Sequence, residues 1–481
     1  MTLRTPEEYV ESLRDGRRVY VAGERVDDVT THPILQITTE HSAGTYRHQQ
    51  DPELQDLFTY DPDGNGQKAS RYFKLSTTPD ELMTRGDLIE EDTRRHNSTF
   101  NITKAVGSDA MHALKVWSHQ TDRELGTDYS PRVEAWINHV RDSDLSLALS
   151  QTDVKGDRSL RPHQQPNPDA YLHIVERRDD GIVVKGAKAH LTAGPVVNEL
   201  IFLPTRAMGE EDADYAVAFA IPASTPGLTM ICRQTGDVSQ TTFDYPISRR
   251  NIETEAVTVL DNVFVPWDRV FLAGEWQAAG ALAVTFANYH RYTAISYKPP
   301  TADLFIGAAQ LVAEQNGAAR AGHVRDKIAQ LIIYGEIIRA CRKSAASEAT
   351  PIEPGMVYPN QVYANAGKYH FASGFHHAAA IVQDIAGGLA ITAPMEADFK
   401  NPETGPYLEH YLTGAGETSA AERVNLFHLI RDMTASEFGG YNYVVTLHGE
   451  GSMAAQLLTT YRDYDLERCK NLVRQALDTA N

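Results

Sequence analysis

The spacing of apolar residues changes twice along the chain, and these two changes constrain the fold more than any other feature. From about residue 51 to 141 the apolar residues recur at helical spacing, and from about 278 onward they do so again. Between about 145 and 271, short alternating runs are separated by turns such as Pro226-Gly227 and Gly236-Asp237. Because 481 residues are too many for one core, we predict an α+β protein of three domains. They are a mainly helical N-terminal domain (1–143), a middle β domain (144–275) and a C-terminal helical bundle (276–481).

Local signals in the first domain predict a capped helix, a hairpin and a turn. Thr5 and Glu8 form a capping-box pattern before a helix that Gly16 would end, and residues 19–26 alternate as a small hairpin. The sequence DPDGNG at 61–66 matches the first half of a calcium loop. Its twelfth position is a Tyr, where calcium needs a bidentate Glu, so we interpret the segment as a turn.

Composition and charge exclude several classes of function. The net charge of −19 argues against nucleic acid as a partner, since phosphate binding needs a basic face. Cys232, Cys341 and Cys469 are too widely spaced for a disulfide framework or a Cys-x-x-Cys metal site. No apolar run reaches the roughly 18 residues of a membrane span, and the N-terminus lacks a signal-peptide core. We therefore expect a cytoplasmic protein without a membrane partner.

The segment from 151 to 194 carries the densest set of candidate ligand-binding residues. Four charged residues surround Gly156 in a stretch without helical or strand periodicity. Two alternating runs follow, at 171–175 and 182–185, and the Asp-Asp-Gly between them predicts a hairpin. A charged loop anchored to a hairpin can present backbone amides and an Arg to a ligand. A solvated loop, or a structural salt-bridge network beneath it, is the competing interpretation.

Several motifs in a fixed order resemble a known family. They are TDVKGDR (152–158), GIVVKGAKAH (181–190), LDNVFVPWDRVFL (260–272), FANYHR (286–291) and LHGEGSMAAQ (447–456). Over nearly its whole length the chain resembles the flavoprotein family of 4-hydroxybutyryl-CoA dehydratase and 4-hydroxyphenylacetate 3-monooxygenase. The resemblance implies an acyl-CoA dehydrogenase-like fold with a middle β-barrel domain. It also implies a flavin between that domain and the bundle, and a homotetramer in which the final helices help complete a neighbour's site.

By this resemblance, the loop and the hairpin line FAD. A flavin needs hydrogen-bond donors at its pyrimidine edge and cations near its pyrophosphate, which Lys and Arg side chains can supply. The HGEGS sequence before the last helix would present a helix N-terminus to a phosphate or flavin edge, although a tight interhelical turn is the alternative. The candidate cofactor-binding residues are Thr152, Asp153, Lys155, Gly156, Asp157, Arg158, Lys188, His190, Thr192, His448, Gly449, Gly451 and Ser452.

His290 is the leading candidate for catalysis. Its place in FANYHRYTAISY matches the histidine that serves the active site in the resembled family. An imidazole titrates near neutral pH, so it can take a proton from a phenol or an activated carbon; a purely structural histidine is the alternative. Arg291 can hold an anionic substrate or pair with an acid, and Tyr292 and Tyr297 can shape the pocket.

Two departures from the family pattern limit what the chain can do. The dehydratase holds an iron-sulfur cluster with three cysteines and the histidine, but the cysteine positions fall here on Asn101, Ala105 and Tyr297. None of these supplies a thiolate, so we expect neither a cluster nor the radical dehydration that depends on it. The monooxygenases commonly hold the phenol with an Arg and a Tyr, whose positions fall near Thr99 and Thr103.

A group of three histidines outside these motifs offers no strong metal signal. His370, His376 and His377 lie close together in the sequence, but no acidic partner sits at helical spacing from them. Because isolated histidines rarely suffice for a metal site, we favour a structural or interface role and predict no metal.

The resemblance and the departures together favour the oxygenase component of a two-component monooxygenase. A separate flavin reductase would supply reduced FAD, oxygen would add to give a flavin hydroperoxide, and a phenolic or related aromatic or heteroaromatic substrate would be hydroxylated. His290 would act as the base or orienting group. A second hypothesis is a cluster-free, flavin-dependent acyl-CoA dehydratase or isomerase. A third is a flavin-binding scaffold that has lost its reaction.

Overall fold

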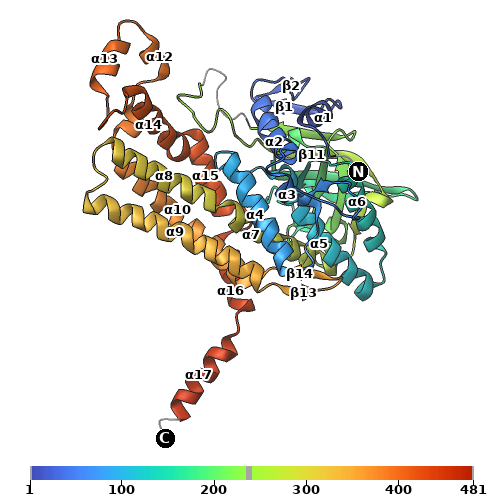
Figure 1. Ribbon diagram of the computed structural model, residues 1–481. Helices are drawn as coiled ribbons and strands as arrows, with labels where there is room; N and C mark the ends of the chain where they lie inside the picture. The colour runs from blue at the N-terminus through green and yellow to red at the C-terminus, as the bar shows by residue number, and fades with distance from the viewer. Residues whose placement is uncertain (1–2, 234–240, 479–481) are drawn as a thin grey trace.

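The computed structural model describes residues 3–233 and 241–478, and Figure 1 shows their arrangement. The predicted turn at Gly236-Asp237 therefore lies outside the described residues. Sheets gather at one side of the molecule and long helices at the other, with α4, α5 and α7 running between them (Figure 1). Along the chain, mainly helical elements come first, most of the strands follow, and mainly helical elements come last.

The N-terminal part is mainly helical, as predicted. Thr5 caps the first helix in a capping box with Glu8, although the helix ends at Glu11, before the predicted Gly16. The DPDGNG segment is a turn, because the Asp61 carboxylate accepts hydrogen bonds from three backbone amides within it. The helices and short strands of this part are α1 (Pro6–Glu11), α2 (Leu35–Gln50), α3 (Gln55–Phe58), β3 (Thr59–Tyr60), β4 (Ala69–Ser70), α4 (Pro79–Arg95), α5 (Ile102–Leu125) and α6 (Tyr129–Asp142).

Two sheets make up the β part of the molecule. One has six strands in the order β2-β1-β10-β11-β7-β6, and the other has four in the order β12-β9-β8-β5. The predicted hairpin is confirmed, since β6 and β7 pair antiparallel with His173 opposite Lys185. The strands are β1 (Val19–Val21), β2 (Glu24–Val26), β5 (Leu147–Ser150), β6 (His173–Arg177), β7 (Gly181–Thr192), β8 (Glu199–Phe202), β9 (Val217–Pro222), β10 (Leu228–Cys232), β11 (Glu255–Pro266) and β12 (Val270–Ala273).

The β-barrel implied by the resemblance is not formed by the described strands. The six-stranded and four-stranded sheets are separate, and neither closes on itself. One reason is that the N-terminal hairpin of β1 and β2 joins the first sheet through parallel pairing of β1 with β10, where Val19 lies opposite Met230. This pairing extends the sheet sideways instead of closing it, and it links residues 19–26 to the middle part of the chain.

The C-terminal part is a bundle of helices with one small hairpin. The single helix predicted from 452 to 477 is two helices, because the chain bends at Tyr464 and Asp465; the second projects away from the body (Figure 1). The elements are α7 (Trp276–Tyr297), α8 (Pro299–Gln315), α9 (Gly322–Ser347), β13 (Thr350–Ile352), β14 (Met356–Tyr358), α10 (Gln361–Ala386), α11 (Leu389–Thr392), α12 (Glu396–Lys400), α13 (Gly405–Tyr411), α14 (Ala420–Thr434), α15 (Glu437–His448), α16 (Met453–Asp463) and α17 (Leu466–Asp478).

The predicted domain boundaries fall in short connections. The first lies between α6 and β5, and the second lies between β12 and α7. The division into three domains stays a prediction, because buried contacts such as the hydrogen bond from Trp117 Nε1 to the carbonyl oxygen of Ala278 (2.9 Å) cross these boundaries. Among the described residues, no helix is both long and apolar enough to cross a bilayer.

Candidate functional site

A cavity of about 910 Å³ lies where the β part meets the helices. Its walls come from the loop after β5, the end of β7, α7, α10, α15 and the turn before α16. Most of the predicted site residues line it, although they come from three separate stretches of sequence. Those that do are Thr152, Lys155, Arg158, His190, Thr192, His290, Arg291, Tyr297, His448, Gly449, Gly451 and Ser452.

The remaining predicted cofactor residues do not line the cavity. Asp153 and Lys188 form a buried ion pair (2.6 Å), and Lys188 also donates to the carbonyl oxygens of Gln151 and Leu203. Asp157 accepts hydrogen bonds from Ser159, and Gly156 packs so closely on Gln165 that a Cβ would lie 2.3 Å from its Oε1. For Asp153 and Lys188 the structural salt bridge, which was the competing interpretation, describes the geometry. They hold the loop that carries Lys155 and Arg158.

Tyr292 does not line the cavity either. Its ring is 1% exposed in the helical core, and its hydroxyl donates to the carbonyl oxygen of Leu82 (2.8 Å). Burial raises the pKa of Tyr292. A side chain in this position supports packing between α4 and α7, away from the cavity.

His290 is held by a carboxylate that the sequence gave no means of finding. Its Nδ1 lies 2.9 Å from Asp109 Oδ2, and Asp109 also pairs with Arg85 (2.6 Å) and accepts from the Thr293 hydroxyl (2.7 Å). Burial acts to raise the pKa of Asp109, but Arg85 and His290 hold it below its ordinary value. Because an ionised Asp109 keeps the proton on Nδ1, the Nε2 atom of His290 is left to accept a proton from a molecule in the cavity. Phe286 stacks on the ring, with centroids 5.2 Å apart.

A second group of titratable residues meets at the C-terminal end of α7. The Tyr297 hydroxyl donates to Glu450 Oε1, and Lys298 Nζ donates to the Tyr297 oxygen (2.8 Å). Lys298 and Lys368 lie 3.7 Å and 3.4 Å from Glu450 Oε2. Burial acts to raise the pKa of Glu450, but the two lysines lower it to about 2. The cluster thus places two buried lysine side chains around one carboxylate at the cavity wall.

Lys298 is expected to be an unusually reactive amine. Burial lowers its pKa to about 7, despite the nearby Glu450 carboxylate, and it lines the cavity. A neutral amine is nucleophilic, so labelling of Lys298 by a small amine-reactive reagent should have its midpoint near pH 7, as read by mass spectrometry. The same peptide in Lys298→Met should show no such labelling. If Lys298 reacted only above about pH 9, as an ordinary lysine does, the lowered pKa would be wrong.

In the structure, the three positions that the resemblance assigns to cluster cysteines offer no thiolate. The Asn101 side chain donates to Thr45 Oγ1 (2.8 Å), Ala105 is fully buried, and Tyr297 stacks on Phe100 with centroids 4.0 Å apart. Among the residues that line the cavity in the described part of the chain, none is a cysteine. The donor set does not fit an iron-sulfur cluster, which requires thiolates.

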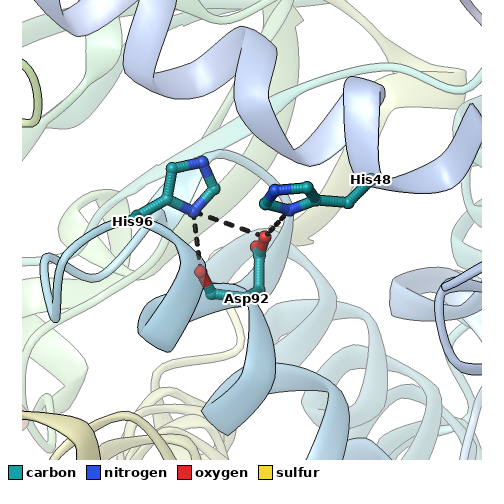
Figure 2. Close-up of side chains that lie close together, drawn as sticks. All are labelled: His48, Asp92 and His96. Carbon is teal, nitrogen blue, oxygen red and sulfur yellow. Dashed lines mark hydrogen bonds and ion pairs between the residues drawn. The ribbon is translucent and has the colours of Figure 1, made fainter. Parts of the chain in front are cut away.

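A cluster of His48, Asp92 and His96 lies apart from this cavity, between α2 and α4 (Figure 2). The ring Nδ1 of His48 lies 2.8 Å from Asp92 Oδ1, while Nδ1 of His96 lies 2.8 Å from the backbone oxygen of Asp92. The hydroxyls of Thr45 and Tyr72 both donate to Asp92 Oδ2 (2.8 Å each). Since each converging ring nitrogen already has a hydrogen-bond partner, we interpret the cluster as a link between the two helices.

The three histidines on α10 also have packing partners. Nε2 of His370 lies 3.2 Å from the carbonyl oxygen of Tyr334, and Nε2 of His377 lies 3.4 Å from Gln330 Oε1. The His376 ring packs edge-on against Tyr443, with centroids 4.4 Å apart. These contacts agree with the structural role that the sequence favoured.

Comparison with protein families matches nearly the whole chain. A model described as the N-terminal part of 4-hydroxyphenylacetate 3-hydroxylase matches residues 5–272, and the corresponding C-terminal model matches residues 279–478. The chain belongs to the 4-hydroxyphenylacetate 3-hydroxylase family. The boundary between the two family models falls where β12 is followed by α7, close to the predicted boundary at 275/276.

Two curated relatives in this hydroxylase family cover nearly the full length. The chain is 34% identical to the 4-hydroxybutyryl-CoA dehydratase/vinylacetyl-CoA-Delta-isomerase of Clostridium aminobutyricum, over 98% of this chain and 99% of that protein. It is 31% identical to the 4-hydroxyphenylacetate 3-monooxygenase oxygenase component of Thermus thermophilus, over 98% and 97%.

Solved structures match equally well. An oxygen-tolerant archaeal 4-hydroxybutyryl-CoA dehydratase from N. maritimus superposes with a TM-score of 0.93 at 31% identity, covering 100% of this chain and 96% of that chain. The oxygenase component of 4-hydroxyphenylacetate 3-monooxygenase, complexed with FAD and 4-hydroxyphenylacetate, gives a TM-score of 0.92 at 31% identity, covering 99% of each chain. Butyryl-CoA dehydrogenase from Megasphaera elsdenii, at 13% identity and a TM-score of 0.50, covering 95% and 96%, confirms the acyl-CoA dehydrogenase-like fold.

Proposed function

We propose that this protein is the oxygenase component of a two-component, FAD-dependent monooxygenase that hydroxylates a phenolic or related aromatic substrate. The observation that carries the proposal is the His290–Asp109 pair facing a cavity of about 910 Å³ without a single cysteine among its described lining residues. Relatives named as monooxygenase oxygenase components, and FAD complexes of one of them, support it.

The cavity fits FAD in size and in chemistry. Its volume lies in the range of roughly 300–1,000 Å³ typical of small-molecule sites. Five non-glycine residues on its wall have positive φ angles: Asn97 (53°), Ser98 (64°), Lys155 (74°), His190 (61°) and Glu450 (56°). Such conformations are costly and gather at functional sites. The cavity also contains the buried, unpartnered Oε2 of Glu255, which calls for a donor from a bound molecule.

The residues that would hold FAD follow from this geometry. Lys155 and Arg158 supply cations for the pyrophosphate, and Thr192 and the turn before α16 supply polar groups for the ring and ribityl chain. Reduced FAD, when bound, supplies the chemistry that activates oxygen. A separate flavin reductase would deliver it, since the relative is one component of a larger system by its name.

His290 has the geometry of a base for a substrate hydroxyl. Its Nε2 accepts the phenolic proton, while Asp109 fixes the ring and stabilises the imidazolium that forms. Phe286, whose ring stacks on His290, limits the access of water to this proton transfer. Arg291 donates to the carbonyl oxygen of Glu450 (3.2 Å) and so holds the turn before α16 against α7.

Oxygen consumption tests the proposal directly. The purified protein is mixed with chemically reduced FAD and a panel of phenols and related aromatics, and products are identified by mass spectrometry. A hydroxylated product formed at the expense of oxygen is the expected result. Hydrogen peroxide alone, with no hydroxylated product from any panel member, would contradict it and would favour a scaffold that binds flavin without this reaction.

The second candidate is a cluster-free acyl-CoA dehydratase or isomerase. It is favoured by the 34% identity to the Clostridium aminobutyricum protein and by the Tyr297–Lys298–Glu450 cluster, which offers further proton donors and acceptors. Anaerobic turnover of an acyl-CoA substrate by the FAD-loaded protein would support it. Strict dependence of turnover on oxygen would remove it.

We also propose that the protein is a homotetramer whose last helix packs on a neighbouring copy. α17 leaves the body of the molecule (Figure 1), and its Leu472, Val473 and Leu477 are 68%, 58% and 65% exposed. A row of large apolar side chains on one helix marks an interaction surface. The double replacement Leu472→Asp and Val473→Asp should lower the molar mass measured by light scattering, while Arg474→Gln on the same helix should leave it unchanged. A tetramer that survived the double replacement would contradict this role of α17.

A further inference from the structure

Arg85 is a buried cation that reaches the carboxylate behind His290 from a third helix. Arg85 lies on α4 and is 3% exposed, Asp109 lies on α5 and is fully buried, and His290 lies on α7. Arg85 Nη2 lies 2.6 Å from Asp109 Oδ1, while the other carboxylate oxygen lies 2.9 Å from His290 Nδ1. The three side chains therefore form a chain of contacts from the interior of the molecule to the cavity, which His290 lines.

Other contacts hold the guanidinium of Arg85 in place. It donates to the backbone carbonyl oxygens of Tyr72 (3.2 Å) and Ala105 (3.1 Å). Gly86, the next residue on α4, lets α4 approach α7 closely, because a Cβ there would lie 2.6 Å from the hydroxyl oxygen of Tyr292. The guanidinium is therefore anchored independently of the carboxylate that it contacts.

Arg85 is the permanent positive charge beside Asp109. Within residues 3–233 and 241–478, the ion pairs of Asp109 are those with Arg85 and His290. The Thr293 hydroxyl also donates to Oδ1 (2.7 Å), but it carries no charge. Burial lowers the pKa of a nearby histidine to about 3 and raises the pKa of three nearby tyrosines, so all four are neutral at neutral pH. These neighbours are His112, Tyr72, Tyr289 and Tyr292.

The charge of Arg85 bears on the tautomer of His290. Burial alone would raise the pKa of Asp109, and the Arg85 guanidinium is the leading charge that holds this pKa below its ordinary value. Without that charge, a fully buried carboxyl tends to take up a proton. A protonated Asp109 would donate its O–H to Nδ1, and the ring proton would then sit on Nε2. His290 would present a donor, and no acceptor, to the substrate hydroxyl.

We propose that Arg85 is a positioning residue of the reaction: by keeping Asp109 ionised, it sets which ring nitrogen of His290 accepts the substrate proton. The inference rests on the proposed function and adds to it a residue that does not line the cavity. A guanidinium suits this task, because it keeps its charge over the whole pH range of such a reaction. The alternative is a purely structural arginine that ties α4 to α5.

Replacement of Arg85 by Met removes the charge and keeps much of the volume. At about pH 6, kcat should be at least about tenfold lower than in the wild type, since an adjacent Arg lowers a carboxyl pKa by about 1–3 units. The deficit should shrink toward about pH 9 as Asp109 ionises, with little change in KM. Arg85→Lys restores a positive charge and should restore the wild-type pH profile.

Two further variants separate charge from structure. Thr293→Val removes a neutral hydrogen bond from the same carboxylate oxygen, so it should leave the pH profile in place. Arg342→Met removes another buried arginine, whose acidic partners are on α4 and do not line the cavity, and it should leave the profile in place as well. A wild-type pH profile in Arg85→Met, or the same shift in Arg342→Met, would overturn the proposal.

An infrared measurement decides the point without FAD, substrate or turnover. The difference spectrum between a protein and its Asp109→Asn derivative, at neutral pH, shows whether Asp109 is a carboxylate or a protonated carboxyl. We expect the carboxylate band in the wild type, Arg85→Lys and Thr293→Val, and the protonated-carboxyl band in Arg85→Met. A carboxylate band in Arg85→Met would overturn the inference.

The infrared bands also keep the remaining outcomes distinct. Should Arg85→Met fail to fold, a protonated Asp109 in the wild type or in Arg85→Lys would still overturn the inference, and carboxylate bands in both would support it. Absence of hydroxylation, with all bands as expected, would refute the proposed function and leave the control of Asp109 by Arg85 standing.

Discussion

Replacement of His290 by Ala is expected to lower kcat by about 10²–10⁴-fold, the usual contribution of a positioned acid or base. The reason is geometric, because Nδ1 is held by Asp109 at 2.9 Å and Nε2 is the atom left for the substrate hydroxyl. Affinity for FAD should change little, since the cations proposed to hold its pyrophosphate lie on the loop after β5. The measurement is oxygen-dependent hydroxylation at saturating substrate, with FAD affinity determined separately.

Two further variants show whether His290 acts as this geometry indicates. His377→Ala removes a histidine that hydrogen-bonds Gln330 away from the cavity, and it should keep wild-type turnover. Asp109→Asn should reduce kcat with little change in KM and should alter the pH profile, because the amide no longer stabilises the imidazolium. An unchanged kcat in His290→Ala would contradict the assignment of the base and would leave the cavity without its proposed proton acceptor.

The order of the elements could be predicted from the sequence because the signals are local. A helical or strand period is visible within a dozen residues, and the β6–β7 hairpin follows from one Asp-Asp-Gly turn. Sheet closure is not local. The parallel pairing of Val19 with Met230 joins segments more than two hundred positions apart. No turn sequence or spacing of apolar residues predicts this pairing.

The same difference between local and non-local signals applies to the residues of the candidate site. The loop residues and His290 belong to continuous motifs, so they were found, whereas Asp109 lies 181 positions from His290 and contributes no motif of its own. Helix geometry would have corrected one assignment: residues two apart on a helix do not share a face, so Tyr292 points away from His290. Tyr297, which is seven residues after His290 on the same helix, lies on the side that faces the cavity. Lys298 was missed because a buried base looks like a surface one in a sequence.

Replacement of Glu450 by Gln is expected to lower the free energy of unfolding by about 3–5 kcal/mol, the usual effect of removing one partner from a buried ion pair. Glu450 is the carboxylate between Lys298 and Lys368, and their side chains are 4%, 2% and 0% exposed. Gln keeps the size and can still accept from Tyr297, so the loss reports charge and not a cavity. Urea unfolding of the wild type and the variant gives the difference.

The pH dependence of that loss distinguishes charge from packing. Without Glu450 the pKa values of both lysines fall further, since burial is then opposed by no anion. The unfolded chain binds more protons than the native one up to the ordinary lysine pKa, so the stability of the variant rises with pH. The deficit relative to wild type should therefore be larger at pH 6 than at pH 9. Glu396→Gln, which removes an exposed pair with Lys400, should cost less than about 1 kcal/mol at either pH. A deficit that stayed constant with pH would show that the two lysines do not carry the effect.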